Sequence, residues 1–361
     1  MTPPVPYSPD LETPEEGEAE TVQGIGDALH EVMETVAADE GRARRAVHAK
    51  GHGYLSARVE VLAGLPPELA QGLFARPGGH GAILRFSTNP GDVLDDAVSV
   101  PRGLALKVLE VEGERLPGSE GERTQDFVLV NGPAFSARSA KAFLGNLELL
   151  AKTTDRAEWA KKALSAALRT TERALEAVGL ESAAIRTLGG APNVHPLGEA
   201  FFSQTAFRHG SFVAKYAVVP RSASLVRHHG EEIDAGSRPD AIREAMARDA
   251  GVAPLEWELR AQLLRNRATM PVEDPTVEWD QEESPYLAVA RIRAEPQAAW
   301  TEARDALDDG LRFSPWTGLA AHRPLGAINR VRRDTYADSA AFRERVNRCP
   351  VREPVTAELP F

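Results

Sequence analysis

The chain has 361 residues, of which 42% are hydrophobic, and a formal net charge of −11. Its one cysteine, Cys349, excludes an internal disulfide framework and a cysteine-based zinc site, and indicates reducing surroundings. Residues 1–41 hold eleven acids and no lysine or arginine, while acids and bases balance in the rest. Because no basic face is available to follow a phosphate backbone, the sequence argues against nucleic acid as a partner.

Targeting signals are also absent from the sequence as given. No apolar run of about 18 residues is present, and the N-terminus lacks the basic and apolar regions of a secretion signal. We therefore expect no membrane insertion and a cytoplasmic location. Composition predicts an acidic arm rich in Pro and Glu over residues 1–21, extended or loosely ordered as a solubilising tail, followed by a single folded domain over residues 22–361.

The first half of this domain is expected to begin with a helix over residues 21–46, because Ile25, Leu29 and Val36 recur at helical spacing. A short helix is also expected over residues 68–74, between two turns. Alternating apolar and polar residues and short connections favour an antiparallel meander. Its four strands are predicted at residues 55–61, 82–88, 103–111 and 125–130.

The second half is expected to open with helical sequence over residues 139–179. Two C-terminal helices are predicted over 298–308 and 326–347, and Phe207–Gly210 has the character of a hairpin turn. Four more strands are predicted at residues 200–206, 211–219, 255–264 and 276–289. Together these elements predict one α+β domain whose sheet can close as a barrel.

Candidate chemistry occurs near both ends of the domain. His48 is surrounded by small residues and glycines directly before the first strand, although a lone histidine there is more often structural than catalytic. Arg332 and Tyr336 share a helix face, so a guanidinium can lie beside the phenol oxygen and favour the phenolate that a tyrosinate haem ligand requires. The spacing of Arg332 and Tyr336 is equally that of an ordinary surface helix.

Five motifs in one order distinguish these readings. They are Arg45-x-x-His48-Ala-Lys-Gly51, the strand 84–88 (Leu-Arg-Phe-Ser-Thr), the segment 101–107 (Pro-Arg-Gly-Leu-Ala-Leu-Lys), the segment 125–135 from Gln125 to Phe135, and Arg332-x-x-x-Tyr336. With them the chain resembles the haem catalases over residues 22–347, and most closely their short, catalase-related branch. The resemblance implies haem b, with its iron, in an eight-stranded antiparallel β-barrel of catalase type with flanking helices.

The resemblance also implies a role for each motif residue. His48 and Asn131 would lie on the distal side of the haem, with Ser87 orienting His48. Tyr336 would be the iron ligand, and Arg332 would hold it as phenolate. Arg45 and Arg85 would meet the haem propionates.

Departures from the family pattern qualify this picture. Ser136 and Leu144 stand where large catalases carry phenylalanine, so we expect a roomier pocket. The His-Arg-x-x-Gly run of large catalases is missing after Tyr336, while His322-Arg-Pro-Leu-Gly326 precedes the helix, so a third propionate contact is unassigned. A long C-terminal segment is lacking, which predicts no bound NADPH. The remaining histidines have no metal-like spacing and are interpreted as structural: His52, His80, His195 and His209.

The sequence thus predicts a haem-dependent enzyme that processes hydrogen peroxide or an organic hydroperoxide, as a catalase or a peroxidase with an organic co-substrate. Three alternatives remain open. One is a peroxygenase, or an enzyme that rearranges or cleaves fatty-acid hydroperoxides. The second is a haem-binding or sensing protein without turnover, and the third is a structural barrel without haem. A homo-oligomer is compatible with all of them.

Overall fold

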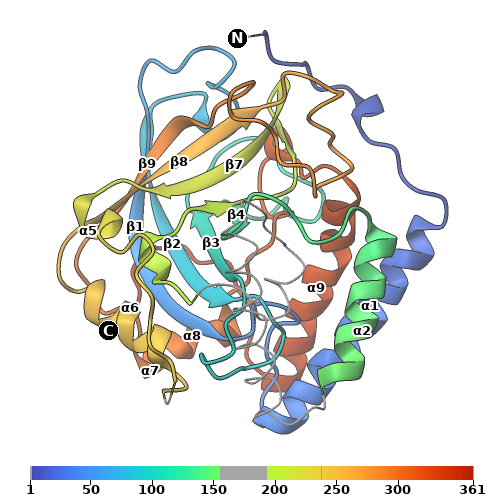
Figure 1. The fold of residues 1–361 in the computed structure, drawn as a ribbon. Coiled ribbons are helices and arrows are strands. Elements are labelled where there is room, and N and C mark those ends of the chain that lie inside the picture. The colour runs from blue at the N-terminus through green and yellow to red at the C-terminus, as the bar shows by residue number, and fades with distance from the viewer. Residues whose placement is uncertain (1, 155–192, 237, 361) are drawn as a thin grey trace, which may run out of the picture.

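The computed structural model describes residues 2–154, 193–236 and 238–360, and its centre is a closed antiparallel β-barrel (Figure 1). Eight strands form the ring in the order β5-β4-β3-β2-β1-β9-β8-β7, and pairing of β5 with β7 closes it. This confirms the predicted α+β class and the eight-stranded barrel. β6 adds to β7 outside the ring. The strands are β1 Gly51–Val61, β2 Gly78–Thr88, β3 Arg102–Val108, β4 Gln125–Val130, β5 Phe201–Phe202, β6 Phe207–His209, β7 Phe212–Pro220, β8 Leu255–Leu263 and β9 Leu287–Ala294.

Strand register decides which side chains enter the barrel. On β2, Leu84 and Phe86 belong to the main hydrophobic core, so Arg85 and Ser87 point to the opposite face of the same strand. The pairing of Ser87 with Gly103 continues this outer face across β3. The outer wall of the barrel at β2 therefore carries Arg85 and Ser87, two of the predicted site residues.

A chain of hydrogen bonds in the core begins and ends in the connection between β1 and β2. The Leu73 amide donates to Nε2 of His322 at 2.9 Å, so the proton of that ring is on Nδ1, which donates to the Tyr216 hydroxyl at 2.9 Å. Tyr216 in turn donates to Nδ1 of His209 at 2.9 Å, and Nε2 of His209 donates to the Leu69 carbonyl at 3.1 Å. Burial lowers the pKa of His322 to about 3 and that of His209 to about 4, so both rings are neutral.

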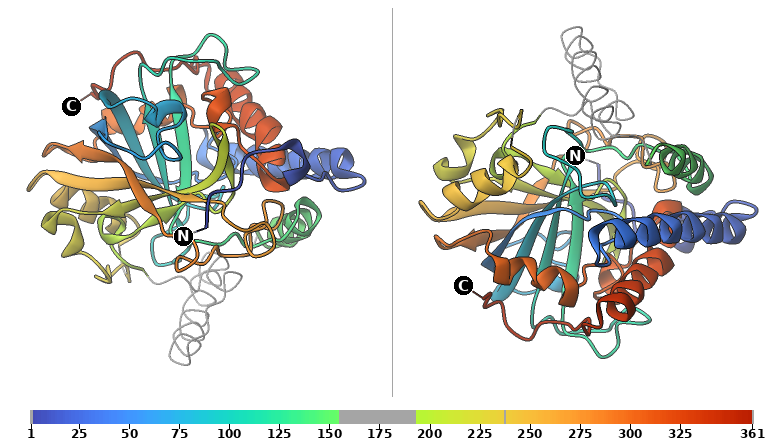
Figure 2. Two further views of the ribbon diagram at one scale, coloured as in Figure 1. Left: turned by 90° about the horizontal axis from the view of Figure 1, so that it is seen from above. Right: turned by 90° about the horizontal axis from the view of Figure 1, so that it is seen from below.

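Three long helices pack together beside the barrel (Figure 2). They are α1 Glu18–Glu40, α2 Ala140–Thr154 and α9 Ala327–Asn347. Apolar side chains from all three share one cluster, which includes Ile25, Leu29, Ala140, Val331 and Phe342. α1 ends earlier than the predicted residue 46, because Gly41 takes a left-handed backbone (φ 69°) that stops the helix.

Shorter elements connect the strands. The α-helices are α5 Ala223–Val226, α6 Ala241–Asp249, α7 Glu302–Asp305 and α8 Leu307–Gly310. The 3-10 helices are η1 Pro9–Leu11, η2 Gly72–Phe74, η4 Pro196–Gly198 and η5 Ala320–His322. Within the residues described, no helix combines the length and the apolar character needed to cross a membrane.

The acidic N-terminal segment lies extended along the barrel. The amide of Val5 donates to the Leu264 carbonyl at 2.7 Å, and that of Tyr7 donates to the Ser211 carbonyl at 2.8 Å. Further along, Glu12 pairs with Arg330 of α9 at 3.2 Å. Backbone hydrogen bonds and ion pairs therefore attach this segment to the folded body.

Three predicted elements differ from the structure in the second half of the chain. The predicted strand 276–289 begins only at Leu287, because Asp274 and Asp280 accept hydrogen bonds from the amides of Thr276 (3.0 Å) and Glu282 (2.9 Å) and so form turns.

The predicted turn Phe207–Gly210 is mostly strand β6, since the hairpin turns within Gly210 and Ser211, where Gly210 has φ 61°. The predicted helix 298–308 is divided into α7 and α8. Residues 155–179 of the predicted helix 139–179 lie outside the described residues.

Candidate functional site

His48 lies in the loop between α1 and β1, with its backbone in the left-handed region (φ 56°). This conformation costs a non-glycine residue on the order of 1 kcal/mol and needs support from its surroundings. The His48 amide donates to the Asn89 carbonyl at 2.8 Å, and the next amide, of Ala49, donates to the Pro90 carbonyl at 3.0 Å. The loop before β1 is thus tied to the turn after β2, and this fixes the position of His48.

The His48 imidazole lies against the outer wall of the barrel. Its Nδ1 is 3.1 Å from the Ser87 hydroxyl, as the sequence predicted for an orienting serine. A side chain on Gly103 would overlap the ring, since a Cβ there would be 2.5 Å from Nδ1. Burial, with the charges of Arg85, Arg332 and Arg45, lowers the pKa of His48 to about 3. The imidazole is therefore neutral at physiological pH and able to accept a proton.

Asn131, the second predicted distal residue, directly follows β4 and is buried. Its Oδ1 accepts a hydrogen bond from the Arg102 amide at 2.7 Å, and its Nδ2 donates to Oε1 of Glu199 at 2.5 Å. The buried guanidinium of Arg102 donates to the other Glu199 oxygen at 2.8 Å. Both functional atoms of the amide are held, and this defines which of them is the donor.

Arg332 and Tyr336 lie on α9, facing the outer wall. Arg332 donates to Asn329 Oδ1 at 3.1 Å and to Thr205 Oγ1 at 3.3 Å, both neutral acceptors. Burial lowers the pKa of Arg332, and the nearby Tyr336 opposes this effect. Tyr336 packs against a buried apolar cluster that includes Ile83 of β2 and Val128 of β4. The structure thus brings the predicted iron ligand and its arginine together, and no described carboxylate forms an ion pair with that arginine.

The predicted propionate arginines, Arg45 and Arg85, converge on one carboxylate, Asp308. Arg85 donates from Nε to Oδ1 of Asp308 at 2.7 Å, and Arg45 approaches the same oxygen at 3.3 Å. Arg85 also donates to the His48 carbonyl at 2.9 Å, which links this cluster to the imidazole. Arg45 belongs to the loop before β1, because α1 ends at Glu40 and not at the predicted residue 46. Despite its burial, Asp308 has a pKa well below the usual range because Arg85 and Arg45 surround it.

A third buried guanidinium, Arg343, completes this cluster. It donates to the backbone carbonyls of Asp308 and Asp309, and to that of Leu311 at 3.1 Å. Burial, followed by the charge of Arg45, lowers the pKa of Arg343 to about 9. Sequence reasoning missed this residue, although it follows Tyr336 by seven positions and so lies on the same face of α9 two turns later. It is the natural candidate for the unassigned third contact.

The two positions expected to widen the pocket have different surroundings. Ser136 is half-buried in the segment after Asn131. Leu144 lies on α2, and its side chain packs at α1, where a Cβ added to Gly24 would be 3.1 Å away. Leu144 therefore serves helix packing, and the prediction of a roomier pocket rests on Ser136 alone.

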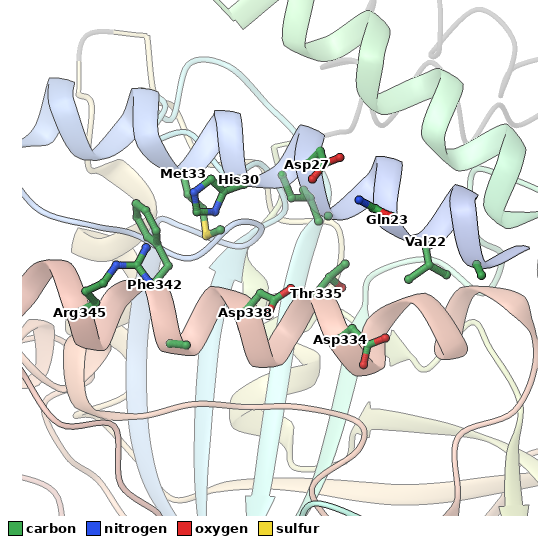
Figure 3. Close-up of a pocket in the computed structure, with 14 residues that line it drawn as sticks. Val22, Gln23, Asp27, His30, Met33, Asp334, Thr335, Asp338, Phe342 and Arg345 are labelled. Atoms are coloured by element: carbon green, nitrogen blue, oxygen red, sulfur yellow. The ribbon is translucent and has the colours of Figure 1, made fainter.

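Two further features of the structure, a surface groove and a buried histidine group, are also candidate sites. A groove of about 460 Å³ runs between α1 and α9 (Figure 3), with the exposed acids Asp27, Asp334 and Asp338 on its sides. None of the predicted site residues lines this groove. Solvent reaches its acids freely, which distinguishes it from the buried cluster.

A buried group of His195, His228 and Asp249 has ligand atoms within 4.8 Å of one another. Nδ1 of His195 accepts from the Leu197 amide at 3.2 Å, so its Nε2 carries the proton toward Asp249. Arg248 donates to the same carboxylate oxygen at 2.6 Å. These atoms are committed to hydrogen bonds, which favours a structural role for the group.

Comparison with known proteins places this fold. A bacterial catalase aligns with 89% of the chain (TM-score 0.57, 17% identity), and a fungal catalase aligns with 88% of it (TM-score 0.59, 15% identity). Catalase A from Saccharomyces cerevisiae aligns with 91% of the chain (TM-score 0.59, 19% identity). It spans 63%, 65% and 67% of those three chains. No protein-family model matches the sequence, and neither does any curated protein.

These similarities show that the protein has the catalase fold, as its motifs predicted. The residues gathered on the outer wall of β1 to β4 and on α9 are those that the resemblance assigned to a haem site. At identities of 15–19%, these similarities establish the fold only. The activity must be argued from the residues of the site.

Proposed function

We propose that the protein is a haem-dependent peroxide-processing enzyme. The observation that carries this proposal is the buried cluster in which Arg45, Arg85 and Arg343 surround Asp308. Three guanidiniums against one carboxylate leave a surplus of two positive charges. Within the described part of the chain, Nε of Arg45 and Nε of Arg343 are also buried without a hydrogen-bond partner. A dianion such as the two propionates of haem matches both the charge and the free donors.

The residues fit the rest of the group as well. Tyr336, on α9 opposite the wall, would ligate the iron, and Arg332 would stabilise its phenolate because no described carboxylate competes for that guanidinium. Haem bound in this way supplies a ferric centre at which a peroxide oxygen can be activated. The propionates would lie against Arg45, Arg85 and Arg343.

His48 would carry the proton during peroxide cleavage. A peroxide must lose a proton from one oxygen and gain it on the other before its O–O bond breaks heterolytically, and a neutral imidazole can do both. The pKa of about 3 keeps His48 neutral, while Ser87 and the bare α-carbon of Gly103 fix its plane. General acid–base help of this kind contributes about 10²- to 10⁴-fold to a rate.

Asn131 would stabilise the departing oxygen by donating a hydrogen bond that does not titrate. Hydrogen peroxide or an organic hydroperoxide would be the substrate, and half-buried Ser136 leaves room for an organic co-substrate. This combination favours peroxidase activity alongside catalase activity.

Haem binding tests the proposal directly. Protein expressed with added haem should contain about one haem per chain and show the absorption of ferric haem with a tyrosinate ligand. Tyr336→Phe should lose or loosen the haem, whereas Tyr7→Phe, which removes a hydroxyl bonded to Arg323 at 2.7 Å outside the wall, should retain it. Absence of a Soret band from the wild-type protein would overturn the proposed function.

A further inference from the structure

Glu199 contacts the proposed distal amide from a distant part of the chain. Its Oε1 accepts from Nδ2 of Asn131 at 2.5 Å, and its Oε2 accepts from Nε of Arg102 at 2.8 Å. The Glu199 side chain is 12% exposed and that of Arg102 is 1% exposed, so solvent screens this ion pair weakly. The carboxylate is therefore a strong, directed acceptor for the Asn131 amide.

The backbone that carries Glu199 is fixed independently of Asn131. The side chain of His195 accepts from the Leu197 amide at 3.2 Å and caps the short helix η4, and Leu197 is fully buried. At Gly198 a Cβ would be 2.2 Å from the His228 carbonyl oxygen, so this backbone lies directly on another segment. Because the backbone at Glu199 is fixed in this way, its carboxylate can define the orientation of the Asn131 amide.

The amide of Asn131 is held from two directions. The Arg102 amide donates to its Oδ1 at 2.7 Å, while the Asn131 amide donates to the Arg102 carbonyl at 3.0 Å. Oδ1 is thus directed to β3 and Nδ2 to Glu199. A 180° rotation of the amide would set its oxygen against the carboxylate, which repels it, and its NH₂ against a backbone N–H.

We propose that Glu199 is a positioning residue that keeps Nδ2 of Asn131 as the hydrogen-bond donor of the distal side, a role that rests on the function proposed above. One N–H of Nδ2 bonds to Glu199, and no acceptor in the described residues takes the second N–H, which is left for a ligand. Loss of Glu199 leaves only the hydrogen bond from the Arg102 amide to Oδ1, so the donor of the distal side is held less firmly.

Fluoride affinity tests this role, because a fluoride ion on ferric haem accepts hydrogen bonds from distal donors and undergoes no turnover. The dissociation constant of fluoride would be measured by absorption titration for wild type, Asn131→Ala, Glu199→Ala and the double variant. We expect each single change to weaken fluoride binding about tenfold, the size of one lost hydrogen bond, and the double change to add little further. Glu199→Gln, which keeps one acceptor oxygen, should recover part of the affinity.

The control is Glu258→Ala, which removes a carboxylate of similar exposure (19%) paired with Arg260 at 2.7 Å on β8. It should leave fluoride affinity unchanged. Wild-type affinity in Glu199→Ala, together with a loss in Asn131→Ala, would overturn the role of Glu199 alone. Additive effects of the two changes on fluoride affinity in the double variant would also overturn the role of Glu199.

A readout without haem separates this proposal from the function it rests on. In the haem-free protein, the Nδ2 protons of Asn131, assigned by comparison with Asn131→Ala, should exchange with solvent faster in Glu199→Ala than in wild type. Failure to bind haem would contradict the proposed function and leave this exchange test decisive for Glu199. Equal exchange in both proteins would refute the positioning.

Discussion

The α-carbon of Gly103 lies directly beneath the imidazole of His48, so closely that a methyl group there would be 2.4 Å from Cε1 of the ring. Gly103→Ala should therefore displace His48 without removing any functional group. We expect the reaction with hydrogen peroxide to slow by at least about tenfold, because small misplacements of a reacting group are costly. Stopped-flow absorption of the haem-loaded variant would measure this rate.

Gly121→Ala is the matched control, since a Cβ at Gly121 meets nothing within 4 Å. It should react at the wild-type rate. If Gly103→Ala also reacts at that rate with its haem spectrum unchanged, the contact with His48 has no bearing on the chemistry.

His48→Ala removes the proposed proton carrier itself. The variant should retain haem, because the predicted iron ligand lies on α9, but its reaction with peroxide should slow by about 10²-fold or more. His30→Ala, which changes a half-exposed histidine on α1, should leave the rate unaltered. A wild-type rate in His48→Ala would contradict the proton-carrier role.

Ser136 governs the expected selectivity among peroxides. The wild-type protein should consume cumene hydroperoxide as well as hydrogen peroxide, and should oxidise a phenolic donor. Ser136→Phe should reduce the ratio of kcat/KM for cumene hydroperoxide to that for hydrogen peroxide by at least about tenfold, because an aromatic ring fills the space. Ser136→Ala should keep the wild-type ratio. An unchanged ratio in Ser136→Phe would place the width-limiting contact elsewhere.

Buried histidines make stability depend on pH. Burial is the leading cause that lowers the pKa of His48 and His322 to about 3 and of His195 and His209 to about 4. It also lowers the pKa of His52 well below its ordinary value. Below pH 6.5 the unfolded chain binds protons at these rings and the folded chain does not, so stability falls as pH falls from 7 to 5.

Two buried acids oppose this trend, since burial raises the pKa of Asp126 and that of Asp96. The net uptake on unfolding at pH 5 should therefore be smaller than the five protons of the histidines. The dependence of the unfolding free energy on pH would measure this number, and His209→Gln should lower it by about one. A free energy that is constant from pH 7 to 5 would contradict the protonation states.

Much of the fold could be predicted because each strand of the meander carries its own signal. β4 occupies the predicted residues 125–130, and α9 begins one residue after the predicted Gly326. Local alternation and helical spacing were sufficient there, since short turns join neighbouring strands. The predicted strand was wrong over residues 276–286. There the side chains of Asp274 and Asp280 accept hydrogen bonds from backbone amides that a strand would donate to its neighbour.

The site could be predicted only where a motif is local. His48, Ser87 and Asn131 follow from short stretches of sequence, and the structure brings the first two into contact on the outer wall of the barrel. Glu199 and Asp308 gave no such signal. Glu199 lies 68 positions from Asn131 and Asp308 lies 223 positions from Arg85, so only the closed barrel brings these partners together.

The chain of hydrogen bonds around Tyr216 has a fixed direction, which begins at the backbone amide of Leu73 and ends at the backbone carbonyl of Leu69. Neither end can supply or accept a transferable proton, because an amide N–H is not an acid and a carbonyl is not a base at physiological pH. Reversing the direction of Tyr216 would set two donors or two acceptors against each other at His209 and His322. This chain therefore offers protons no route through the core, and protons for the acid–base chemistry proposed on the outer wall would have to arrive by another path.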